Sequence, residues 1–350
     1  MNHRGLTPVL ALLSVLIVFA SRSTAQGACY QNAPQTTIYH EHFVFYSGQT
    51  YLPYGSECLC GDGVPRGYAD CWIYTDQSYA TCPTCRIAAG QPINLATGNT
   101  FVSQTDISIP GLGGGMGLGR TWNSMPTGGQ SAGMFGMDWV STYEEKMFVD
   151  SDGLVKYSTG TGDLWSFGVT TLFGTGNTST YSAIAPRNSG ASLLGDGTHL
   201  IITFKNGEKR VFNQSNGQLQ SITDRNGNAT QLTYDSSNRL TTVTDAASRH
   251  LYFNYAVQGY PNLVSSVTSD FGVSLTYVYS TNYLVKVIRP DNTFVTFDYA
   301  ALTGSTTYLL ADVKDQNGKI LESHTYDYSN RGLSSQKASG VDAVSITYLQ

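Results

Sequence analysis

Charge is scarce in this sequence, and long basic or apolar stretches are missing from most of it. Charged residues make up 13% of the chain, and the formal net charge is −5. The absence of a basic stripe argues against a nucleic acid as partner. After residue 25 no apolar run approaches the ~18 residues of a membrane-spanning helix, so we expect no transmembrane segment in the mature chain. Glycine and asparagine interrupt every candidate amphipathic helix, which favours an all-β fold.

Sequence patterns of catalysis are also missing. The segment Gly111–Gly119 contains six glycines in nine residues, but no G-x-G-x-x-G fits its register and no Gly-Lys-Ser/Thr follows. It is therefore interpreted as a tight or flexible β connection. Glu144 and Glu145 would not work as paired acids on a strand, where adjacent side chains point to opposite faces. Three single histidines are each expected to be solvated or satisfied by a neighbour: His199, His250 and His324. We predict that the protein is not an enzyme and has no catalytic, cofactor-binding or metal-binding residue.

The first 25 residues have the features of an export signal. Arg4 precedes a 12-residue apolar run, Val9–Ala20, which is too short to span a bilayer. Small residues follow at Ser23 and Ala25, the positions that a signal peptidase reads, so we expect cleavage after Ala25. An uncleaved membrane anchor is the alternative. Residues 1–25 are interpreted as a signal peptide, and the mature protein is expected to be secreted or held at the cell surface.

All six cysteines fall in one stretch behind this signal, and none follows it. An even number of clustered cysteines in an exported chain predicts a disulfide-stapled module, here residues 26–90. Six cysteines allow 15 pairings, and the sequence does not choose among them. A zinc site made from Cys58-x-Cys60 and Cys82-x-x-Cys85 is the alternative, but an oxidising compartment favours disulfides. The disulfide candidates are Cys29, Cys58, Cys60, Cys71, Cys82 and Cys85.

Residues 199–350 contain an internal repeat. An aliphatic anchor recurs at intervals of 21, 24, 20 and 26 residues, and another aliphatic residue stands three positions before it. A turn former stands five positions after each anchor, and a tyrosine twelve or thirteen positions after it. The anchors are Ile222, Val243, Val267, Val287 and Val313; the turn formers are Gly227, Ser248, Gly272, Asn292 and Gly318; the tyrosines are Tyr234, Tyr255, Tyr279, Tyr299 and Tyr326. A sixth repeat with a polar anchor is recognised from Leu333, Gln336 and Tyr348.

Each repeat predicts two short strands joined by a tight turn. An anchor and the aliphatic residue three positions before it cannot both face inward on a regular strand, because strand side chains alternate. Either a bulge or turn falls between them, or they line different faces. A single hairpin is not stable alone, so neighbouring repeats must stack to bury a shared face. We therefore predict a stacked β-hairpin array of about six repeats over residues 199–350.

Residues 91–198 carry a further series of motifs. Gln91–Asn99 (QPINLATGN) leads into Thr105–Gly111 (TDISIPG), and Gly119–Ser124 (GRTWNS) precedes Gly133–Trp139 (GMFGMDW). In this order the motifs resemble the domain of unknown function that commonly precedes the repeats of RHS proteins, with Trp122 where tyrosine is usual. This part of the chain is interpreted as an RHS-associated N-terminal β domain.

The repeats resemble the YD repeats of the same family. The resemblance rests on their spacing and on the Tyr-Asp pairs Tyr234-Asp235 and Tyr326-Asp327. It implies an array in which many repeats wind into a β-sheet spiral that walls a hollow shell. The sequence lacks the Asp-Pro-x-Gly self-cleavage core of the family, and about six repeats are fewer than a closed shell needs.

Two functions follow as hypotheses. The first is a secreted or cell-surface structural and interaction protein, with the repeats as scaffold or binding wall. The second, implied by the resemblance, is the N-terminal portion of a toxin-encapsulating RHS shell whose C-terminal core and payload are missing. A partner of the first would be a carbohydrate or a protein. Carbohydrate is the expected class, because tyrosine rings and polar side chains suit sugars. The favoured interpretation of the repeat tyrosines themselves remains a structural one, as cross-strand core partners.

The last strand candidate predicts a further interaction. Val344–Leu349 alternates apolar and polar residues and carries neither charge nor proline. Such a strand at the edge of a sheet is open to pairing with another strand. We therefore expect self-association through this edge near Tyr348.

Overall fold

The computed structural model describes residues 93–95, 97–126, 130–150, 153–171, 178–186, 189–302, 307–340 and 343–348, and the backbone alone of short strands between 44 and 89. The expected signal peptide lies outside the described residues. Cys58 lies on a strand of which only the backbone is described, and the other candidates lie outside: Cys29, Cys60, Cys71, Cys82 and Cys85. The cleavage site and the choice between disulfides and zinc therefore stay predictions.

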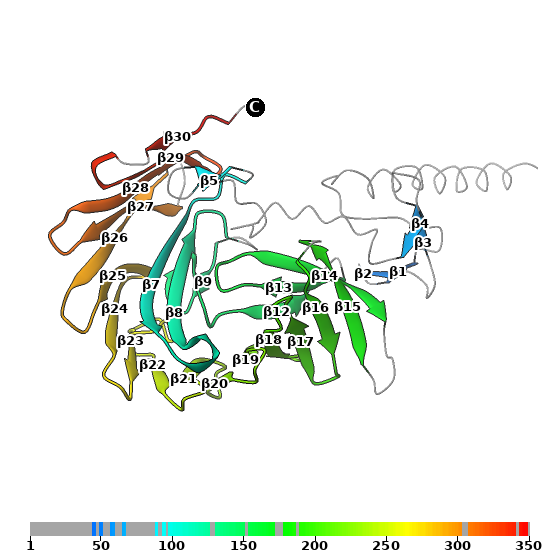
Figure 1. Cartoon of the computed structure of the whole chain (residues 1–350). Helices are drawn as coiled ribbons and strands as arrows, with labels where there is room; N and C mark the ends of the chain where they lie inside the picture. The colour runs from blue at the N-terminus through cyan, green and yellow to red at the C-terminus, as the bar shows by residue number, and fades with distance from the viewer. Residues whose placement is uncertain are drawn as a thin grey trace, which may run out of the picture. The chain divides into compact units, whose positions relative to one another are not determined.

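The chain divides into two compact bodies. The first body comprises residues 1–76, 148–156 and 165–198, and the second comprises residues 77–147, 157–164 and 199–350. Strands dominate both (Figure 1), and the described helices are two short 3-10 turns, η1 (Leu112–Gly114) and η2 (Ala338–Gly340). The expected all-β fold is confirmed.

The first body contains two short antiparallel pairs and a meander. The pairs are β1 (Val44–Tyr46) with β2 (Gln49–Tyr51) and β3 (Glu57–Leu59) with β4 (Pro65–Gly67). The meander is formed by β14 (Leu164–Thr171), β15 (Ser179–Ala185) and β16 (Ser192–Gly195). Its buried apolar residues are Leu164, Phe167, Ile184 and Leu193. Two further strands, β12 (Lys146–Val149) and β13 (Val155–Ser158), lie where the chain passes between the bodies.

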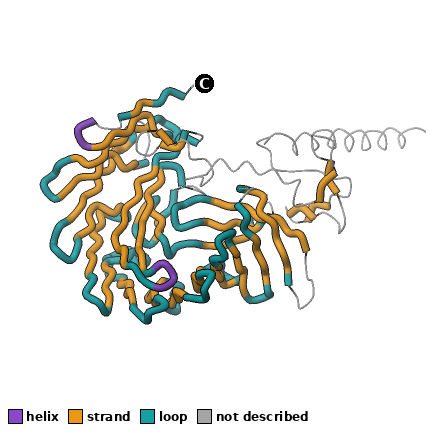
Figure 2. The backbone as a smooth tube through the Cα atoms, viewed as in Figure 1, coloured by secondary structure: helices purple, strands orange, loops and turns teal. Residues whose placement is uncertain are grey.

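The repeats form one antiparallel array in the second body. Its strands follow one another in space in the order of the sequence, joined by short turns (Figure 2). This confirms the predicted stacked β-hairpin array. The strands are β17 (His199–Thr203), β18 (Lys209–Asn213), β19 (Leu219–Thr223), β20 (Ala229–Tyr234), β21 (Leu240–Thr244), β22 (His250–Asn254), β23 (Ser266–Ser269), β24 (Ser274–Ser280), β25 (Tyr283–Ile288), β26 (Phe294–Ala301), β27 (Tyr308–Asp315), β28 (Ile320–Tyr326), β29 (Gly332–Lys337) and β30 (Val344–Ser345).

A β-bulge lets the anchor and the aliphatic residue before it face the core together. In the second repeat Tyr234 pairs with Leu240 while Thr233 pairs with Thr242, so one residue of β21 is left over between them. Leu240 and the anchor Val243 are consequently both buried. Equivalent register shifts occur where β24 meets β25, β26 meets β27 and β28 meets β29. Of the alternatives that the sequence left open, the bulge is the correct one.

Each repeat tyrosine donates its hydroxyl to a backbone carbonyl that lies 15 or 16 residues earlier. Tyr234 bonds the carbonyl of Leu219 at 2.6 Å, and Tyr279 bonds that of Val264 at 2.8 Å. The remaining four bonds run from Tyr255 to Leu240, Tyr299 to Leu284, Tyr326 to Leu310 and Tyr348 to Gly332. Most of the acceptors are the aliphatic residues three positions before the anchors. The tyrosines are thus internal hydrogen-bond donors of the array.

The five predicted turn formers all adopt the left-handed backbone conformation. Their φ angles are +87° at Gly227, +59° at Ser248, +93° at Gly272, +64° at Asn292 and +78° at Gly318. In several turns an aspartate carboxylate accepts hydrogen bonds from backbone N–H groups of the turn. Asp235 accepts hydrogen bonds from the backbone N–H groups of Ser237 and Arg239 and from the Arg239 side chain. The aspartate of the Tyr-Asp pair is therefore a turn residue.

The sixth repeat is shifted by one residue from its predicted alignment. Tyr348 bonds the carbonyl of Gly332, and the register partner of Tyr326 is also Gly332. Gly332 thus occupies the aliphatic position and Ser335 the anchor position, in place of Leu333 and Gln336. Ser335 is 1% exposed, whereas Gln336 faces solvent. The predicted alignment is wrong because neither true core position is aliphatic.

A smaller sheet, named the cover sheet here, packs on the repeats. It consists of β7 (Phe101–Ile109), β8 (Met116–Asn123) and β11 (Trp139–Ser141), with β8 in the centre. Two short pairs accompany it, β9 (Ala132–Gly133) with β10 (Gly136–Met137), and β5 (Ala88–Ala89) with β6 (Ile93–Asn94). The glycine-rich segment forms η1 and the start of β8, as a tight connection would.

Aromatic pairs join the cover sheet and the strands beside it to the inner face of successive repeats. The pairs are Tyr143 with Phe253, Phe135 with Tyr277, Trp139 with Phe297 and Trp122 with Tyr326, with ring centroids 4.7–6.3 Å apart. Backbone bonds add to these contacts, since the carbonyl of Met134 accepts from the N–H of Val264 at 2.8 Å. The core of the second body therefore lies between the cover sheet and the array.

Valine at Gly227 or Gly272 should destabilise the second body. The left-handed conformation costs a residue with a Cβ about 1–2 kcal/mol, and β-branching stiffens the side chain further. Space is not limiting, because a Cβ added at either glycine meets nothing within 4 Å. Ser248→Gly is the matched control and should change stability little. Chemical denaturation measures the effect, and midpoints equal to wild type for both valine variants would contradict the turn assignment.

Removing the hydroxyl of Tyr279 should also destabilise the array. Tyr279→Phe leaves the carbonyl of Val264 without this donor, and an unsatisfied buried acceptor costs about 1–3 kcal/mol. Tyr328→Phe is the control, because that side chain is 79% exposed. The denaturation midpoint of Tyr279→Phe should lie below that of Tyr328→Phe. Coincident curves would show that the hydrogen bond of the Tyr279 hydroxyl does not contribute to stability.

Candidate functional site

A fully buried arginine lies at the centre of the second body. Arg120 belongs to β8, and its side chain is 0% exposed. Its Nε and Nη2 bind both carboxylate oxygens of Asp106 on the neighbouring strand, with Nη2 to Oδ1 at 2.9 Å. Tyr277 of the third repeat donates its hydroxyl to Asp106 Oδ2 at 2.8 Å. The cover sheet and the repeats therefore share this ion pair.

Four aromatic rings surround the Arg120 guanidinium. Its Cζ lies 4.7 Å from the Trp139 ring, 5.4 Å from Tyr277, 5.6 Å from Phe135 and 5.8 Å from Phe297. Such contacts stabilise a cation that has lost its water. Tyr277 and Phe297 stand two positions before the repeat tyrosines Tyr279 and Tyr299, on the inner face of their strands. The repeats thus contribute two walls of the aromatic cage.

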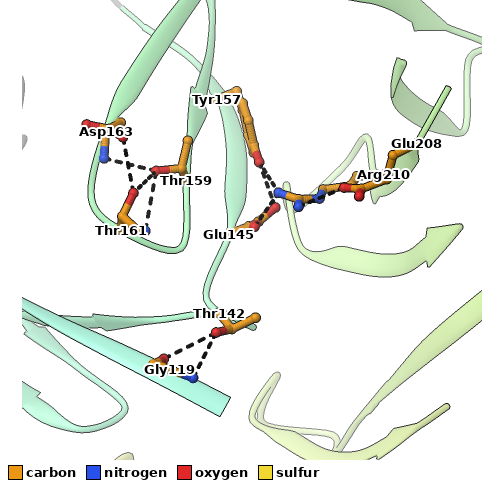
Figure 3. A network of polar contacts seen from close by, with 9 residues as sticks. All are labelled: Gly119, Thr142, Glu145, Tyr157, Thr159, Thr161, Asp163, Glu208 and Arg210. Carbon is orange, nitrogen blue, oxygen red and sulfur yellow. Dashed lines mark hydrogen bonds and ion pairs between the residues drawn. The ribbon is translucent and has the colours of Figure 1, made fainter. Parts of the chain in front are cut away.

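A second polar network joins the start of the array to the residues around β12 and β13 (Figure 3). The hydroxyl of Tyr157 donates to Glu145 Oε2 at 2.8 Å, and Arg210 Nη1 contacts both groups. The other terminal nitrogen, Nη2, pairs with Glu208 at 2.8 Å. Burial raises the pKa of Glu145, and the charge of Arg210 opposes that shift. Phe204 lies 5.1 Å from the Arg210 guanidinium.

Glu144 and Glu145 do not lie on a strand, which corrects the premise of the sequence analysis. β11 ends at Ser141 and β12 begins at Lys146, so both glutamates occupy the connection between them. Glu144 accepts the backbone N–H of Met134, whereas Glu145 binds Tyr157 and Arg210. The two carboxylates therefore have separate partners.

Two other carboxyl groups are buried without a salt bridge to a described residue. Burial raises the pKa of Glu144 to about 7 against the hydrogen bond from Met134. Burial also raises the pKa of Asp138 to about 7, opposed by hydrogen bonds from Ser131 and Gln130. A raised pKa marks many general acids, but here each group is hydrogen-bonded inside the contact between the cover sheet and the repeats.

These groups bind one another and other groups of the protein. Among the described residues no cluster of three or more His, Cys, Asp or Glu could hold a metal ion. No helix in the described part of the chain has the length and apolar character needed to cross a membrane. The arrangement is chemically suited to holding two layers together.

The predicted residues are distributed along the array rather than gathered in one site. The turn formers lie at the hairpin ends, and the tyrosines form a ladder of single hydrogen bonds. The histidines also differ in setting. His250 is paired with Asp270 at 2.7 Å, whereas His324 is 3% exposed. Sequence analysis missed the residues of the two polar networks: Arg120, Asp106, Tyr277, Glu145, Tyr157 and Arg210. A charged residue at a position predicted to face inward on a strand is the signal that could have identified Arg120.

Breaking the buried ion pair should be costly. Arg120→Met leaves Asp106 buried without its cation, and loss of one partner of such a pair typically costs about 3–5 kcal/mol. The double variant Arg120→Met with Asp106→Leu should recover part of that loss, because it leaves no unpaired charge. Urea denaturation of both variants measures the coupling. Equal losses for the single and double variants would show that the ion pair is not what joins the layers.

The stability of the second body should fall as the pH rises. Because the folded-state pKa of Glu144 is about 7 and its ordinary value is 4.5, the native state holds this proton more tightly than the unfolded state. Stability from this group is therefore present below pH 4.5 and lost as the pH rises towards 7. Glu144→Gln should be more stable than wild type at pH 8 and gain nothing at pH 4.5. Unfolding midpoints across this range test it, and parallel profiles would contradict it.

Family comparisons agree with the motifs and the repeats. Residues 90–167 match the Domain of unknown function (DUF6531), and residues 215–250 match the RHS Repeat. The chain is 35% identical over 163 residues to the tRNA3(Ser)-specific nuclease WapA of Bacillus spizizenii, and 34% identical over 163 residues to the tRNA nuclease WapA of Bacillus subtilis. Each match covers 44% of this chain and 6% of the relative.

Two solved structures share part of the chain trace. One is the Photorhabdus luminescens Tc holotoxin pore, with a TM-score of 0.34 and 10% identity over 69% of this chain and 16% of that one. Another is the TcdB2-TccC3-Cdc42 complex, with a TM-score of 0.26 and 12% identity over 64% of this chain and 10% of that one. The family assignment rests on the sequence matches and on the hairpin array. A DUF6531 match over residues 90–167 thus precedes an RHS-repeat match over residues 215–250.

Proposed function

We propose that this protein is an exported RHS scaffold whose repeats form a structural wall and whose DUF6531 domain holds that wall in shape. The observation that carries the proposal is the use of the repeat-defining side chains. The hydroxyls of all six repeat tyrosines donate hydrogen bonds to backbone carbonyls of the array. A residue that holds its own sheet together supports a structural role rather than catalysis.

The cover sheet supports the same function. The sheet and the turn that follows it contact the array from Phe253 in the second repeat to Tyr326 in the fifth, and the sheet inserts Arg120 between two further repeats. A sheet fastened at several repeats resists changes in the curvature of the array. This is the property that a wall needs.

A carbohydrate ligand gains no support from the repeat tyrosines, because their hydroxyls are engaged inside the array. Three other tyrosines are the exposed ones among the described residues: Tyr252, Tyr308 and Tyr328. A sugar-stacking face of the wall would have to use rings of this kind. A glycan ligand and self-association through β30 both remain proposals that binding and light-scattering measurements can test.

A role in toxin assembly is the second candidate, and the relatives favour it. The WapA proteins are named as tRNA nucleases, and this chain spans 6% of their length. In this second function the chain would be the opening part of a wall around a payload. The scaffold function and the toxin function share the same architecture and differ in whether a toxic activity accompanies the wall.

Expression of the full chain in a bacterial host separates the candidates. A scaffold should be exported, leave host growth unchanged and leave purified tRNA intact. Growth arrest by this chain alone, or cleavage of tRNA by the purified protein, would overturn the scaffold proposal. The Arg120→Met variant is the control, because an activity of a contaminating nuclease would not depend on the fold of this protein.

A further inference from the structure

The inner residues that meet between the fifth and sixth repeats differ from their counterparts. The residue two positions before a repeat tyrosine is the register partner of the next anchor. Between the second and fifth anchors these pairs are apolar or aromatic: Leu232–Val243, Phe253–Val267, Tyr277–Val287 and Phe297–Val313. The next pair is His324–Ser335. Its members are 3% and 1% exposed, so two polar side chains occupy a core position.

Neither side chain of this pair has a hydrogen bond within the described part of the chain. Both ring nitrogens of His324 and the hydroxyl of Ser335 are buried without such a partner. Glu322 Oε2 lies 3.6 Å from His324 Nε2, which is an electrostatic contact but too long for a hydrogen bond. An unsatisfied buried polar group costs about 1–3 kcal/mol. Three such atoms on facing residues therefore need partners that the neighbouring protein groups do not supply.

Residues 97–100 of the DUF6531 match form a loop that lies against this region. The carbonyl of Gly98 accepts the backbone N–H of Gly332 at 2.8 Å. The loop approaches so closely that a Cβ on Gly332 would lie 2.3 Å from Thr100 Oγ1. Thr100 is 0% exposed, and its hydroxyl lies within hydrogen-bonding reach of the Tyr326 hydroxyl. This segment therefore packs against the start of the sixth repeat, next to the His324–Ser335 pair.

We propose that His324 and Ser335 line a binding site for ordered water at the step between the fifth and sixth repeats. A hydroxyl and an imidazole together offer both donors and acceptors, and a buried water typically makes about three hydrogen bonds. Serine is smaller than the valine at this position in the preceding repeats, which leaves room. A metal ion does not fit, because the described residues contain no suitable ligand cluster here. This site goes beyond the scaffold function, since it assigns a ligand to one joint of the wall.

Two measurements on the wild-type full chain test the site directly. A high-resolution crystal structure should show water within hydrogen-bonding distance of His324 and Ser335. Selective ¹⁵N labelling of the histidines should show hydrogen-bonded shifts at both ring nitrogens of His324. A direct His324–Ser335 hydrogen bond without water, or ring nitrogens that are not hydrogen-bonded, would overturn the proposal. Neither measurement depends on a variant that folds.

A double-mutant cycle adds a second test. His324→Phe with Ser335→Val recreates the Phe297–Val313 pair of the preceding step. Each single variant should lower the Tm, because it removes one ligand of the water and leaves the other unsatisfied. The double variant should return to the wild-type Tm or exceed it, and its crystal structure should lack the water. His250→Phe is the control at an exposed histidine. Losses that simply add in the double variant would contradict a shared ligand.

Discussion

A β-bulge inside the sheet interrupts backbone hydrogen bonding, and the tyrosine hydroxyls of the array compensate for the interruption. The bulge turns the aliphatic residue and the anchor to the same face, and it interrupts the ladder of backbone hydrogen bonds. A carbonyl released in the core needs a donor, and the tyrosine of the following strand supplies it. The distance from donor to acceptor stays at 15 or 16 residues in all six repeats. The spacing between anchors, in contrast, varies from 20 to 26 residues. It can vary because the added residues follow a tyrosine and so lie outside the segment between the carbonyl acceptor and its tyrosine donor.

The second constraint is the burial of Arg120. A guanidinium removed from water has to be compensated inside the protein, and no single layer provides enough partners for it. Asp106 comes from the cover sheet, while Tyr277 and Phe297 come from two different repeats. The aromatic cage around the cation is complete only when the layers are assembled. This joins the cover sheet to the repeats within the second body, which is the physical basis of the proposed wall.

The sequence predicted the parts of this fold whose contacts are local. Hairpins, positive-φ turns and the tyrosine period act within about one repeat, so they leave a periodic trace. The Arg120 site does not, because Asp106 and Tyr277 stand 171 residues apart and no repeat spacing joins them. Glu144 and Glu145 were placed on a strand because nothing in the local sequence shows that β11 ends at Ser141. The sixth repeat was misaligned because Leu333 gave a better aliphatic match than Gly332, although Gly332 holds the core position.

Departures from the repeat pattern mark the places where the array meets other parts of the second body. The inner pair at the first anchor is Arg210 with Ile222, and Arg210 there binds Glu145 and Tyr157. The inner pair at the other end is His324 with Ser335, beside residues 97–100. The pairs between them are apolar or aromatic, and Tyr277 uses its one polar atom on Asp106. An apolar pair suffices where one hairpin stacks on the next, whereas a polar residue is retained where a different segment must be held in one register. The DUF6531 domain is thus fixed at both ends of the array and at its centre, so the wall cannot slide along its cover.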